Sequence, residues 1–245
     1  MSKVVGIIPA RWGSTRFPGK SLHRIAGKPL IQYVWERCIE AGCFDQMIIA
    51  TDDMRIAKAG FNFGAEVAIT SADHPSGTDR IAEVAKKLKK ASIIFNIQGD
   101  EPTIDTGLLQ RVVRKLSKSR RMAMITAATP ISPEEARNEH NVKVILDSKN
   151  DALYFSRSLI PFPRGKVPIT YYKHLGIYGY RRKALLDFVK MPASSLERAE
   201  QLEQLRALEN GVKIRVVVSE TAAIGVDTPE DAREVEQLLL SRNNG

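Results

Sequence analysis

The chain has 245 residues, of which 43% are hydrophobic and 27% are charged, a composition that is ordinary for a globular protein. No apolar run approaches the roughly 18 residues of a membrane-spanning helix, and the N-terminal residues lack the long apolar region of a signal peptide. We therefore expect one domain spanning residues 1–245, located in the cytoplasm and without a membrane partner. The 37 basic residues outnumber the 28 acidic ones, giving a net charge of +9 that favours an anionic partner, either nucleic acid or a small polyphosphate.

The first expected strand, at residues 3–9, leads into a basic segment, IIPARWGSTRFPGKS at residues 7–21. This segment ends like a Walker phosphate-binding loop, but five residues separate Gly13 from Gly19 where a Walker loop has four. Pro18 also lacks the backbone N–H that such a loop needs. We therefore exclude a P-loop and favour a triphosphate gripped by side chains at the first strand–helix turn, over a basic surface loop without a ligand. The cations expected to hold the triphosphate are Arg11, Arg16 and Lys20.

Short β-branched runs alternate with helical periods through the first hundred residues. The runs are almost continuously apolar, as in strands covered on both faces, and lie at residues 3–9, 46–51, 66–70 and 91–98. Apolar residues spaced three or four apart predict helices between them, at residues 29–42, 54–64 and 78–91. This repetition predicts an α/β fold of the Rossmann-like type, with a mostly parallel sheet and helices on both faces.

The rhythm changes after about residue 120. Several runs with few helices between them predict a smaller, partly antiparallel subregion at about residues 122–180. Two amphipathic helices are expected next, at residues 181–190 and 195–209, followed by a strand at 213–219 and a last helix from Pro229. The sequence contains no internal repeat or long linker, which supports a single domain.

Two acidic clusters are candidates for a metal site. The sequence QGDEP at residues 98–102 ends the fourth apolar run, where a carboxylate near low dielectric requires a cationic partner. We interpret Asp100 as a Mg²⁺ ligand, since Mg²⁺ takes one or two protein carboxylates together with substrate phosphates. A second acid, Asp227, stands just outside a helix-capping box made by Thr228 and Asp231. Periodicity alone does not place Asp227 beside Asp100, and it also allows Asp227 a simple electrostatic role at the helix terminus.

Other polar clusters have weaker signals. The loop at residues 71–80 places Ser76 and Gly77 before a helix, whose N-terminus can approach a base or a ribose. The basic run at residues 111–121 carries six cations and no acid, and we interpret it as a solvated helix face because no aromatic residue interrupts it. The late elements carry polar side chains that, taken singly, are typical of structural roles. They are Arg157, His174, Tyr178, Glu203 and Gln204.

Taken together, eight segments from residue 4 to about residue 232 resemble the bacterial CMP-Kdo synthetases, the 3-deoxy-manno-octulosonate (Kdo) cytidylyltransferases. The related CMP-sialic acid synthetases share the opening IPAR.GS pattern, whereas the Pro-Gly-Lys ending at Lys20 is similar to the Kdo branch. One departure is the pair Asn150 and Asp151, where relatives usually carry Gly-Tyr or a similar pair. The eight segments are IIPARWGSTRFPGKSL, ATDD, SADHPSGTDR, NIQGDEP, VKVILD with ALYFSRSLIPF, KHLGIYGYRR, LEQLRALENG and GVDTPED.

The resemblance implies a homodimeric enzyme that binds CTP and Kdo, uses Mg²⁺, binds no nucleic acid, and forms CMP-Kdo for lipopolysaccharide biosynthesis. It implies that the late antiparallel subregion serves substrate closure and dimerisation. The nucleotide would be held by Arg11, Arg16, Lys20, Ser76, Gly77, Arg80 and Asp100. The catalytic residues would be Arg11, Lys20, Asp100 and Asp227, of which Asp100 and Asp227 bind the metal. The sugar would be surrounded by Gln98, Arg157, His174, Tyr178, Glu203 and Gln204.

Two alternatives stay open at the level of sequence. The first is a cytidylyltransferase for 8-amino-Kdo or another acidic sugar such as sialic acid, because a single contact can read one exchanged substituent. The second is a basic RNA-binding protein that uses residues 111–121, which would bind RNA with a steep salt dependence and ignore CTP.

Overall fold

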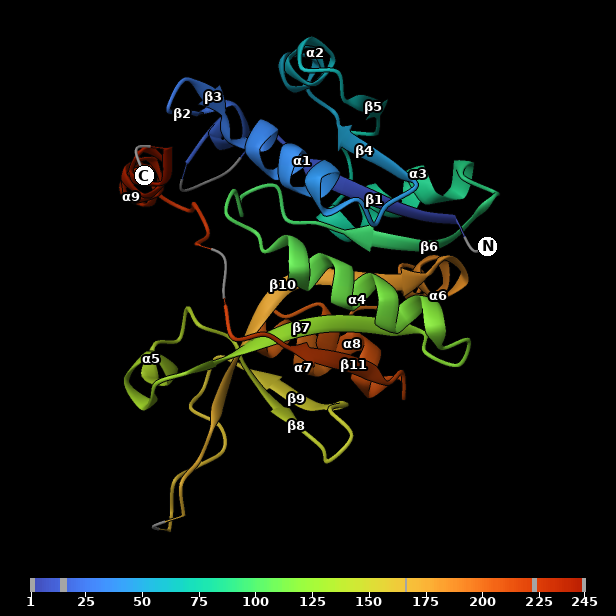
Figure 1. Ribbon diagram of the computed structural model, residues 1–245. Coiled ribbons are helices and arrows are strands. Elements are labelled where there is room, and N and C mark those ends of the chain that lie inside the picture. Colours follow the sequence, from blue (N-terminus) through green and yellow to red (C-terminus); the bar gives the residue numbers. More distant parts are fainter. Residues whose placement is uncertain (1–2, 14–16, 166, 222–223, 244–245) are drawn as a thin grey trace.

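The structure is a computed structural model that describes residues 3–13, 17–165, 167–221 and 224–243. A central sheet runs through the molecule, with helices on both of its faces (Figure 1). The strands are β1 (Lys3–Ala10), β2 (Arg24–Ile25), β3 (Lys28–Pro29), β4 (Gln46–Thr51), β5 (Glu66–Ile69), β6 (Ala91–Asn96), β7 (Met124–Ile131), β8 (Lys143–Leu146), β9 (Ala152–Ser156), β10 (Tyr171–Arg181) and β11 (Ile214–Val218). The helices are the 3₁₀ turn η1 (Lys20–Leu22) and α1 (Leu30–Ala41), α2 (Met54–Asn62), α3 (Gly77–Lys87), α4 (Thr106–Lys118), α5 (Pro133–Arg137), α6 (Arg182–Phe188), α7 (Ser195–Glu200), α8 (Gln204–Glu209) and α9 (Pro229–Asn243).

The main sheet has the strand order β11-β7-β10-β6-β1-β4-β5, with the β8–β9 hairpin attached to β10. Strands β6, β1, β4 and β5 are mutually parallel, and β11 is parallel to β7. Strand β10 is antiparallel to both β6 and β7, so it joins the early and late parts of the chain. The predicted mostly parallel sheet with a smaller antiparallel subregion is therefore confirmed.

Two hydrophobic cores lie on opposite faces of the sheet. Alternate residues of β1 enter different cores, because successive side chains of a strand point to opposite faces: Ile8 packs in one core and Ile7 in the other. The first core contains residues of α1 and α4, and the second contains residues of α3, α6 and α8. Strand β1 is thereby buried on both sides, as its continuous apolar sequence predicts.

A third, smaller core fixes the C-terminal helix. It joins Ile25 and Leu30, near the start of α1, to Val226, Ala232 and Val235 around α9. In Figure 1, α9 lies beside β2 and β3, at the edge where strands β1 and β6 end. The segment that enters α9 therefore approaches the carboxyl ends of the parallel strands. Within the described residues, no helix is long and apolar enough to cross a membrane.

The helix expected at residues 195–209 is wrong as a single element, because the chain breaks between α7 and α8. Gln201 adopts a left-handed conformation with φ of 54°, which ends the first helix. The break lets Leu202 and Leu205 both enter the second core. The two helices then fold against each other, and the Arg206 guanidinium pairs with the Glu197 carboxylate.

Candidate functional site

A cleft of about 470 Å³ opens where β1 and β6 end, at the edge of the sheet that the strand pattern predicted. Six segments far apart in sequence form its walls: the end of β1, the loop around η1, the N-terminus of α3, the loop after β6, the connection between α7 and α8, and the segment before α9. Arg16 lies outside the described residues. The other predicted residues that line this cleft are Arg11, Lys20, Ser76, Gly77, Arg80, Gln98, Asp100, Glu203 and Asp227.

The centre of the cleft is an ion cluster around Lys20. Its Nζ donates to Asp100 Oδ2 at 2.6 Å and to Asp227 Oδ1 at 3.0 Å, and also to the carbonyl oxygen of Val226 at 3.0 Å. Burial by itself lowers the pKa of Lys20, but the charges and hydrogen bonds of Asp100 and Asp227 outweigh it, and the pKa is raised. The structure thus brings together the two carboxylates that sequence spacing could not place side by side.

The opening loop is shaped by a close approach of backbone to an aromatic ring. Gly19 has φ of 71°, and its N–H donates to the carbonyl oxygen of Trp12 at 2.9 Å. A Cβ at Gly19 would lie 2.9 Å from the Trp12 ring, so a side chain here would meet both strain and a clash. The guanidinium of Arg55 stacks 3.3 Å from the centroid of the same ring, and Asp53 holds Arg55 by two hydrogen bonds. The turn that directs Lys20 into the cleft is therefore held in place by Arg55 of α2, which stacks on Trp12. We call this contact the Arg55–Trp12 clasp.

The segment before α9 is fixed by the predicted capping box. Asp231 N–H donates to Thr228 Oγ1 at 3.2 Å, and Asp231 Oδ2 accepts from the backbone N–H groups of Thr228 and Asp227, both at 2.8 Å. Val226 N–H donates to the carbonyl oxygen of Asp100 at 2.8 Å, which ties this segment to the loop after β6. Backbone contacts therefore set the positions of both carboxylates before any ligand is considered.

The N-terminus of α3 forms a third wall of the cleft. Ser76 caps the helix by accepting from Asp79 N–H at 3.2 Å. Arg80 also lines the cleft but is only 4% exposed. Its Nη1 donates to Thr70 Oγ1 at 2.5 Å and pairs with Asp52 Oδ1 at 3.2 Å. In this structure Arg80 secures the loop that precedes α3.

A second cavity, of about 200 Å³, adjoins the first. Gln98 and Glu203 line both cavities and so form the wall that they share. Gln98 is held by Nε2 donating to the carbonyl oxygen of Gly176 at 3.1 Å, and a Cβ at Gly176 would come within 2.8 Å of Gln98 Cγ. The predicted sugar residues that line the second cavity are Gln98, His174, Tyr178, Glu203 and Gln204.

His174 is held as a neutral ring. Burial lowers its pKa to about 3. Its Nε2 lies 3.0 Å from Thr126 Oγ1, and the rings of Phe155 and Tyr178 pack around it. At neutral pH this side chain offers hydrogen bonds without charge, which suits a site that must receive an anionic or hydroxylated ligand.

Arg157 lies outside both cavities. Its Nε donates to the carbonyl oxygen of Glu200 at 3.0 Å, and its Nη1 donates to that of Glu139 at 3.3 Å. Its backbone N–H donates to the Glu200 carboxylate at 2.9 Å. The structure therefore does not bring Arg157 together with the other predicted sugar residues.

Sequence reasoning missed three polar residues of the second cavity. Asn96 and Thr78 line it directly, and Thr126 holds His174. Asn96 is 4% exposed, and its Oδ1 is buried without a hydrogen-bond partner within the described residues. A polar residue inside an apolar strand run is a signal that could have found Asn96 and Thr126, because buried polar groups require partners.

Glu101, beside the ion cluster, is the most perturbed acid at this edge of the sheet. Burial, followed by the neighbouring Asp100 charge, raises the pKa of Glu101 to about 8. Lys173 and the backbone N–H of Gly176 act in the opposite direction. The loop after β6 therefore carries one carboxylate engaged with Lys20 and a neighbouring carboxyl whose pKa is raised.

The oxygen atoms around Lys20 form a donor set suited to a hard cation. Two carboxylate oxygens, of Asp100 and Asp227, and the carbonyl oxygen of Val226 converge on one ammonium group. Within the described ranges there is no group of three or more His, Cys, Asp or Glu residues that could hold a metal. Two carboxylates are nevertheless what Mg²⁺ uses when phosphates and water complete its shell.

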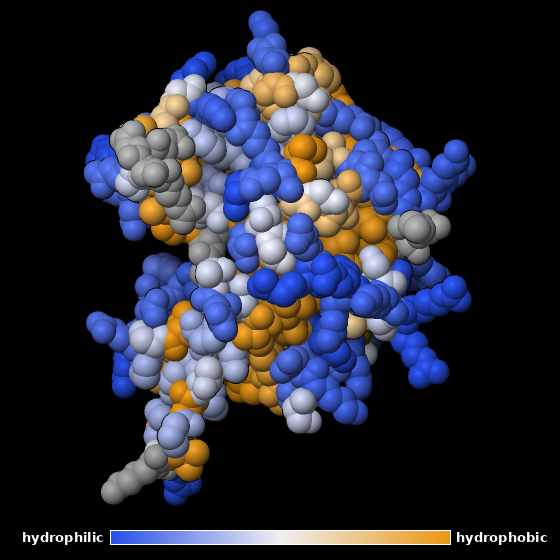
Figure 2. Space-filling model, in the orientation of Figure 1, coloured by the Kyte–Doolittle hydropathy of each residue, from blue (hydrophilic) through white to orange (hydrophobic). Residues whose placement is uncertain are grey.

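The basic run at residues 111–121 falls on α4 and the turn after it, away from the cleft. Figure 2 shows hydrophilic residues over α4 beside a hydrophobic strip over β7 and β11. Arg111 donates to Ser219 Oγ at 3.0 Å and lies 3.7 Å from Asp105. Arg114 and Lys118 are exposed. This is the amphipathic helix with a solvated face that the sequence favoured.

A mostly parallel α/β sheet with cations and two carboxylates at the carboxyl ends of its strands suits a ligand that carries phosphates. In agreement, residues 5–214 match the model of the cytidylyltransferase family. The fold is shared with 4-diphosphocytidyl-2C-methyl-D-erythritol synthase from Anaerococcus prevotii, at a TM-score of 0.65 and 15% identity, covering 98% of this chain and 99% of that one.

Curated relatives narrow the class. The chain is 47% identical to a protein of Syntrophotalea carbinolica, over 96% of this chain and 98% of the relative, and 50% identical to one of Solibacter usitatus, over 97% and 94%. Both are named 3-deoxy-manno-octulosonate cytidylyltransferase. A solved structure of CMP:2-keto-3-deoxy-manno-octonic acid synthetase complexed with CTP matches with a TM-score of 0.95 and 42% identity, covering 98% of this chain and all 100% of that one. The chain belongs to the 3-deoxy-manno-octulosonate cytidylyltransferases.

Proposed function

We propose that the protein transfers CMP from CTP to the anomeric hydroxyl of Kdo, releasing pyrophosphate and forming CMP-Kdo for lipopolysaccharide biosynthesis in the cytoplasm. The observation that carries this proposal is the pair of adjoining cavities, one centred on Lys20 with Asp100 and Asp227, the other smaller and lined by several polar side chains. A charged cleft suits a triphosphate, and a cavity of about 200 Å³ with several hydrogen-bonding side chains suits one sugar. Family membership names the two substrates that fit.

On the nucleotide side, Arg11 and Lys20 neutralise the triphosphate, and Ser76 with Gly77 seats the cytidine against the N-terminus of α3. Gly77 lets the backbone of α3 lie close to Pro9 and to a ligand, since a Cβ at this position would lie 3.3 Å from the Pro9 ring. Arg16, outside the described residues, is proposed as a third phosphate ligand, and buried Arg80 supports the nucleotide loop from behind.

Mg²⁺ is the proposed cofactor, and the residues that would hold it are Asp100 and Asp227. Their oxygens already converge on one cationic group, which is the support that the structure gives to this assignment. When bound there with substrate phosphates, Mg²⁺ supplies charge neutralisation between the triphosphate and the acidic sugar. Lys20 then remains within reach of the same phosphates as a second positive charge.

In the proposed reaction the anomeric oxygen of the sugar attacks the α-phosphorus of CTP. A new oxygen–phosphorus bond forms, the bond between the α-phosphorus and its bridging oxygen to the β-phosphate breaks, and pyrophosphate leaves with that oxygen. The hydroxyl proton is lost to solvent. The protein contributes mainly position and charge, because it holds the two substrates on either side of Gln98 and Glu203.

On the sugar side, hydrogen bonds would come from five residues that line the second cavity, Gln98, His174, Tyr178, Glu203 and Gln204. Arg157 is proposed to pair with the sugar carboxylate, a role that requires its guanidinium to leave the carbonyls of Glu200 and Glu139. This part of the proposal therefore includes a movement of the late segments when the sugar binds.

A homodimer is part of the proposal. Large apolar side chains are exposed in the late antiparallel subregion: Leu153 is 60% exposed, Phe162 78% and Val167 77%. An interface that covers them would remove this apolar surface from water. Light scattering on the purified protein tests the dimer, and a monomer across the micromolar range would reject it.

Pyrophosphate release by purified protein tests the proposed reaction. We expect release with CTP, Kdo and Mg²⁺ together, and none with UTP or with EDTA. Activity that persists after exhaustive removal of divalent cations would reject Mg²⁺ dependence. Turnover of 8-amino-Kdo or N-acetylneuraminate in place of Kdo would keep the nucleotide site and change the sugar. Silence with all three sugars would reject the function.

A further inference from the structure

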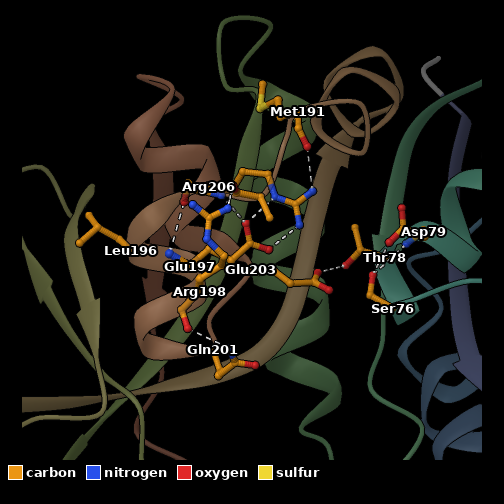
Figure 3. A network of polar contacts seen from close by, with 12 residues as sticks. Ser76, Thr78, Asp79, Met191, Leu196, Glu197, Arg198, Gln201, Glu203 and Arg206 are labelled. Carbon is orange, nitrogen blue, oxygen red and sulfur yellow. Dashed lines mark hydrogen bonds and ion pairs between the residues drawn. The ribbon is translucent and has the colours of Figure 1, made fainter.

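Glu203 lies at the break between α7 and α8, and its side chain points away from the helix that it precedes (Figure 3). It occupies the N-cap position of α8, yet its carboxylate accepts no capping hydrogen bond from that helix. An acidic residue at an N-cap ordinarily accepts from the backbone N–H groups of the first turn. Figure 3 shows instead that the Glu203 side chain extends away from α8, across to Thr78 on α3.

The contact between these two residues is short and partly buried. Thr78 Oγ1 donates to Glu203 Oε2 at 2.7 Å, and Thr78 is only 6% exposed. The two residues are 125 positions apart in the chain. A hydrogen bond to a charged acceptor belongs to the stronger class in proteins.

This bond lies at the boundary between the two cavities. Thr78 lines the second cavity, and Ser76 and Gly77, which precede it, line the nucleotide cleft. Glu203 lines both cavities. The bond therefore joins α3, whose N-terminus lines the nucleotide cleft, to the connection between α7 and α8 at residues 201–203, which lines the second cavity. We call this connection the α7–α8 corner.

The backbone on the Glu203 side is held in place independently. Arg206 Nε donates to Glu197 Oε2 at 2.7 Å, and its Nη2 also pairs with Glu197 Oε1. Arg206 Nη1 donates to the carbonyl oxygen of Met191 at 3.3 Å, and its guanidinium lies 4.9 Å from the Phe188 ring centroid. The corner is thus fixed without Thr78, so that Thr78 acts on the direction of the Glu203 side chain rather than on the fold of the corner.

We propose that Thr78 is a positioning residue, which fixes the Glu203 carboxylate between the cavities so that it faces the sugar. A carboxylate anchored through one oxygen presents the other in a defined direction, and it loses little freedom when a sugar hydroxyl binds. The inference rests on the proposed function and deepens it, because it assigns a residue of the nucleotide-side helix to recognition of the sugar.

The test compares Thr78→Val, which removes the hydroxyl and keeps the shape, with Thr78→Ser, which keeps the hydroxyl and removes a methyl group. Steady-state kinetics are measured on both substrates, and each variant is also made in a Glu203→Ala background. We expect Thr78→Val to lower kcat/KM for Kdo by about tenfold or more, the value of one hydrogen bond to a charged group. We expect the KM for CTP to change less than about twofold and Thr78→Ser to stay within about threefold of the wild type. In the Glu203→Ala background, Thr78→Val should have almost no further effect, since no carboxylate remains to be positioned.

Several outcomes would overturn the proposal. An unchanged kcat/KM for Kdo in Thr78→Val is one, and equal losses in Thr78→Val and Thr78→Ser are another. An additive loss in the Glu203→Ala background would show that Thr78 acts through some other contact. The wild-type arm separates these results from a failure of the proposed function: a wild type that turns over Kdo beside an unaffected Thr78→Val rejects only the positioning role, whereas a wild type silent with Kdo rejects the function and the inference together.

Discussion

Two ion-pair clusters are built differently: the Lys20 cluster in the nucleotide cleft and the Arg206–Glu197 pair between α7 and α8. In the nucleotide cleft, Lys20 meets Asp100 and Asp227 across 80 and 207 residues of chain. At the α7–α8 corner, Arg206 meets Glu197 across nine residues. The side chains of the first cluster are 17%, 28% and 49% exposed, whereas those of the second are 13% and 11% exposed.

Both cations are fully engaged with protein oxygens, so the two clusters differ in access to a ligand rather than in the number of their hydrogen bonds. Arg206 spends its donors on the Glu197 carboxylate and on the carbonyl oxygen of Met191, and its plane packs near the Phe188 ring. Lys20 binds two acids that both line an open cleft. The closed pair holds two helices together, whereas the open cluster keeps its charges accessible to a ligand. Ion pairing in a structure therefore does not identify a functional site until access to the charges is considered.

Replacing one acid of the open cluster should have the largest effect on activity. We expect Asp100→Asn to reduce kcat/KM by at least about a hundredfold, because it removes a charge that the proposed metal and phosphates require. The melting temperature should stay close to that of the wild type, since Asp100 is partly exposed. Asp187→Asn, an exposed acid paired with Lys183 on α6, is the matched control and should leave kcat/KM unchanged. Near wild-type turnover by Asp100→Asn at saturating Mg²⁺ would mean that Asp100 is not a ligand.

Breaking the closed pair should instead act on stability. We expect Glu197→Gln to lower the free energy of unfolding by about 3 kcal/mol, because the Arg206 charge is left without a partner in a largely buried place. Chemical denaturation measures this change. The double variant Glu197→Gln with Arg206→Met should recover part of the loss, since no unpaired charge remains. If the single variant is as stable as the wild type, the two clusters do not differ in the way their burial indicates.

Local signals in the sequence predicted where Asp100 and Asp227 lie relative to their own strand and helix, but not that the two residues lie side by side. The capping box of Thr228 and Asp231 predicted the start of α9, and it thereby set Asp227 just outside the helix. The end of an apolar run marked Asp100. Their adjacency depends on packing of α9 against the first turn of α1 and on one backbone bond between the two loops, contacts that span the chain. Sequence periodicity carries no record of such contacts.

The closed corner was less accessible to sequence reasoning. Residues 195–209 have a continuous helical period, but Gln201 takes a left-handed conformation that tertiary packing imposes. Family resemblance identified Glu203 as a candidate sugar-binding residue. Its hydrogen-bond partner Thr78 was not predicted, because it lies in a segment that contains several polar residues. Asn96 was hidden inside an apolar strand run, although a polar side chain there already indicated a buried partner or ligand.

The buried His174 extends the comparison to pH. Its pKa is lowered to about 3 by burial, against about 6.5 when unfolded, so the unfolded chain binds the extra proton between these values. Stability should therefore fall as the pH drops below about 6.5, with a slope of up to about 1.4 kcal/mol per pH unit from this residue. Denaturation between pH 4 and 7 should show a shallower decline in His174→Asn, whereas the exposed control His140→Asn should follow the wild type. Parallel curves for His174→Asn and the wild type would show that His174 is not buried neutral.

The smallest expected effect on activity comes from removing the Arg55–Trp12 clasp at the opening loop. Arg55 is 57% exposed, and it stacks on Trp12 while Asp53 holds it. An exposed cation–π contact is weak. We therefore expect Arg55→Ala to raise the KM for CTP by roughly two- to fivefold while kcat changes little, because the loosened loop still carries Lys20. Arg55→Lys, which keeps the charge and loses the planar stack, should lie between Arg55→Ala and the wild type. The chain has two tryptophans, so in a Trp35→Phe background the emission of Trp12 reports the clasp directly. An unchanged Trp12 emission in Arg55→Ala would mean that the stack does not form in solution, and the open cluster would then owe its geometry to the loop backbone alone.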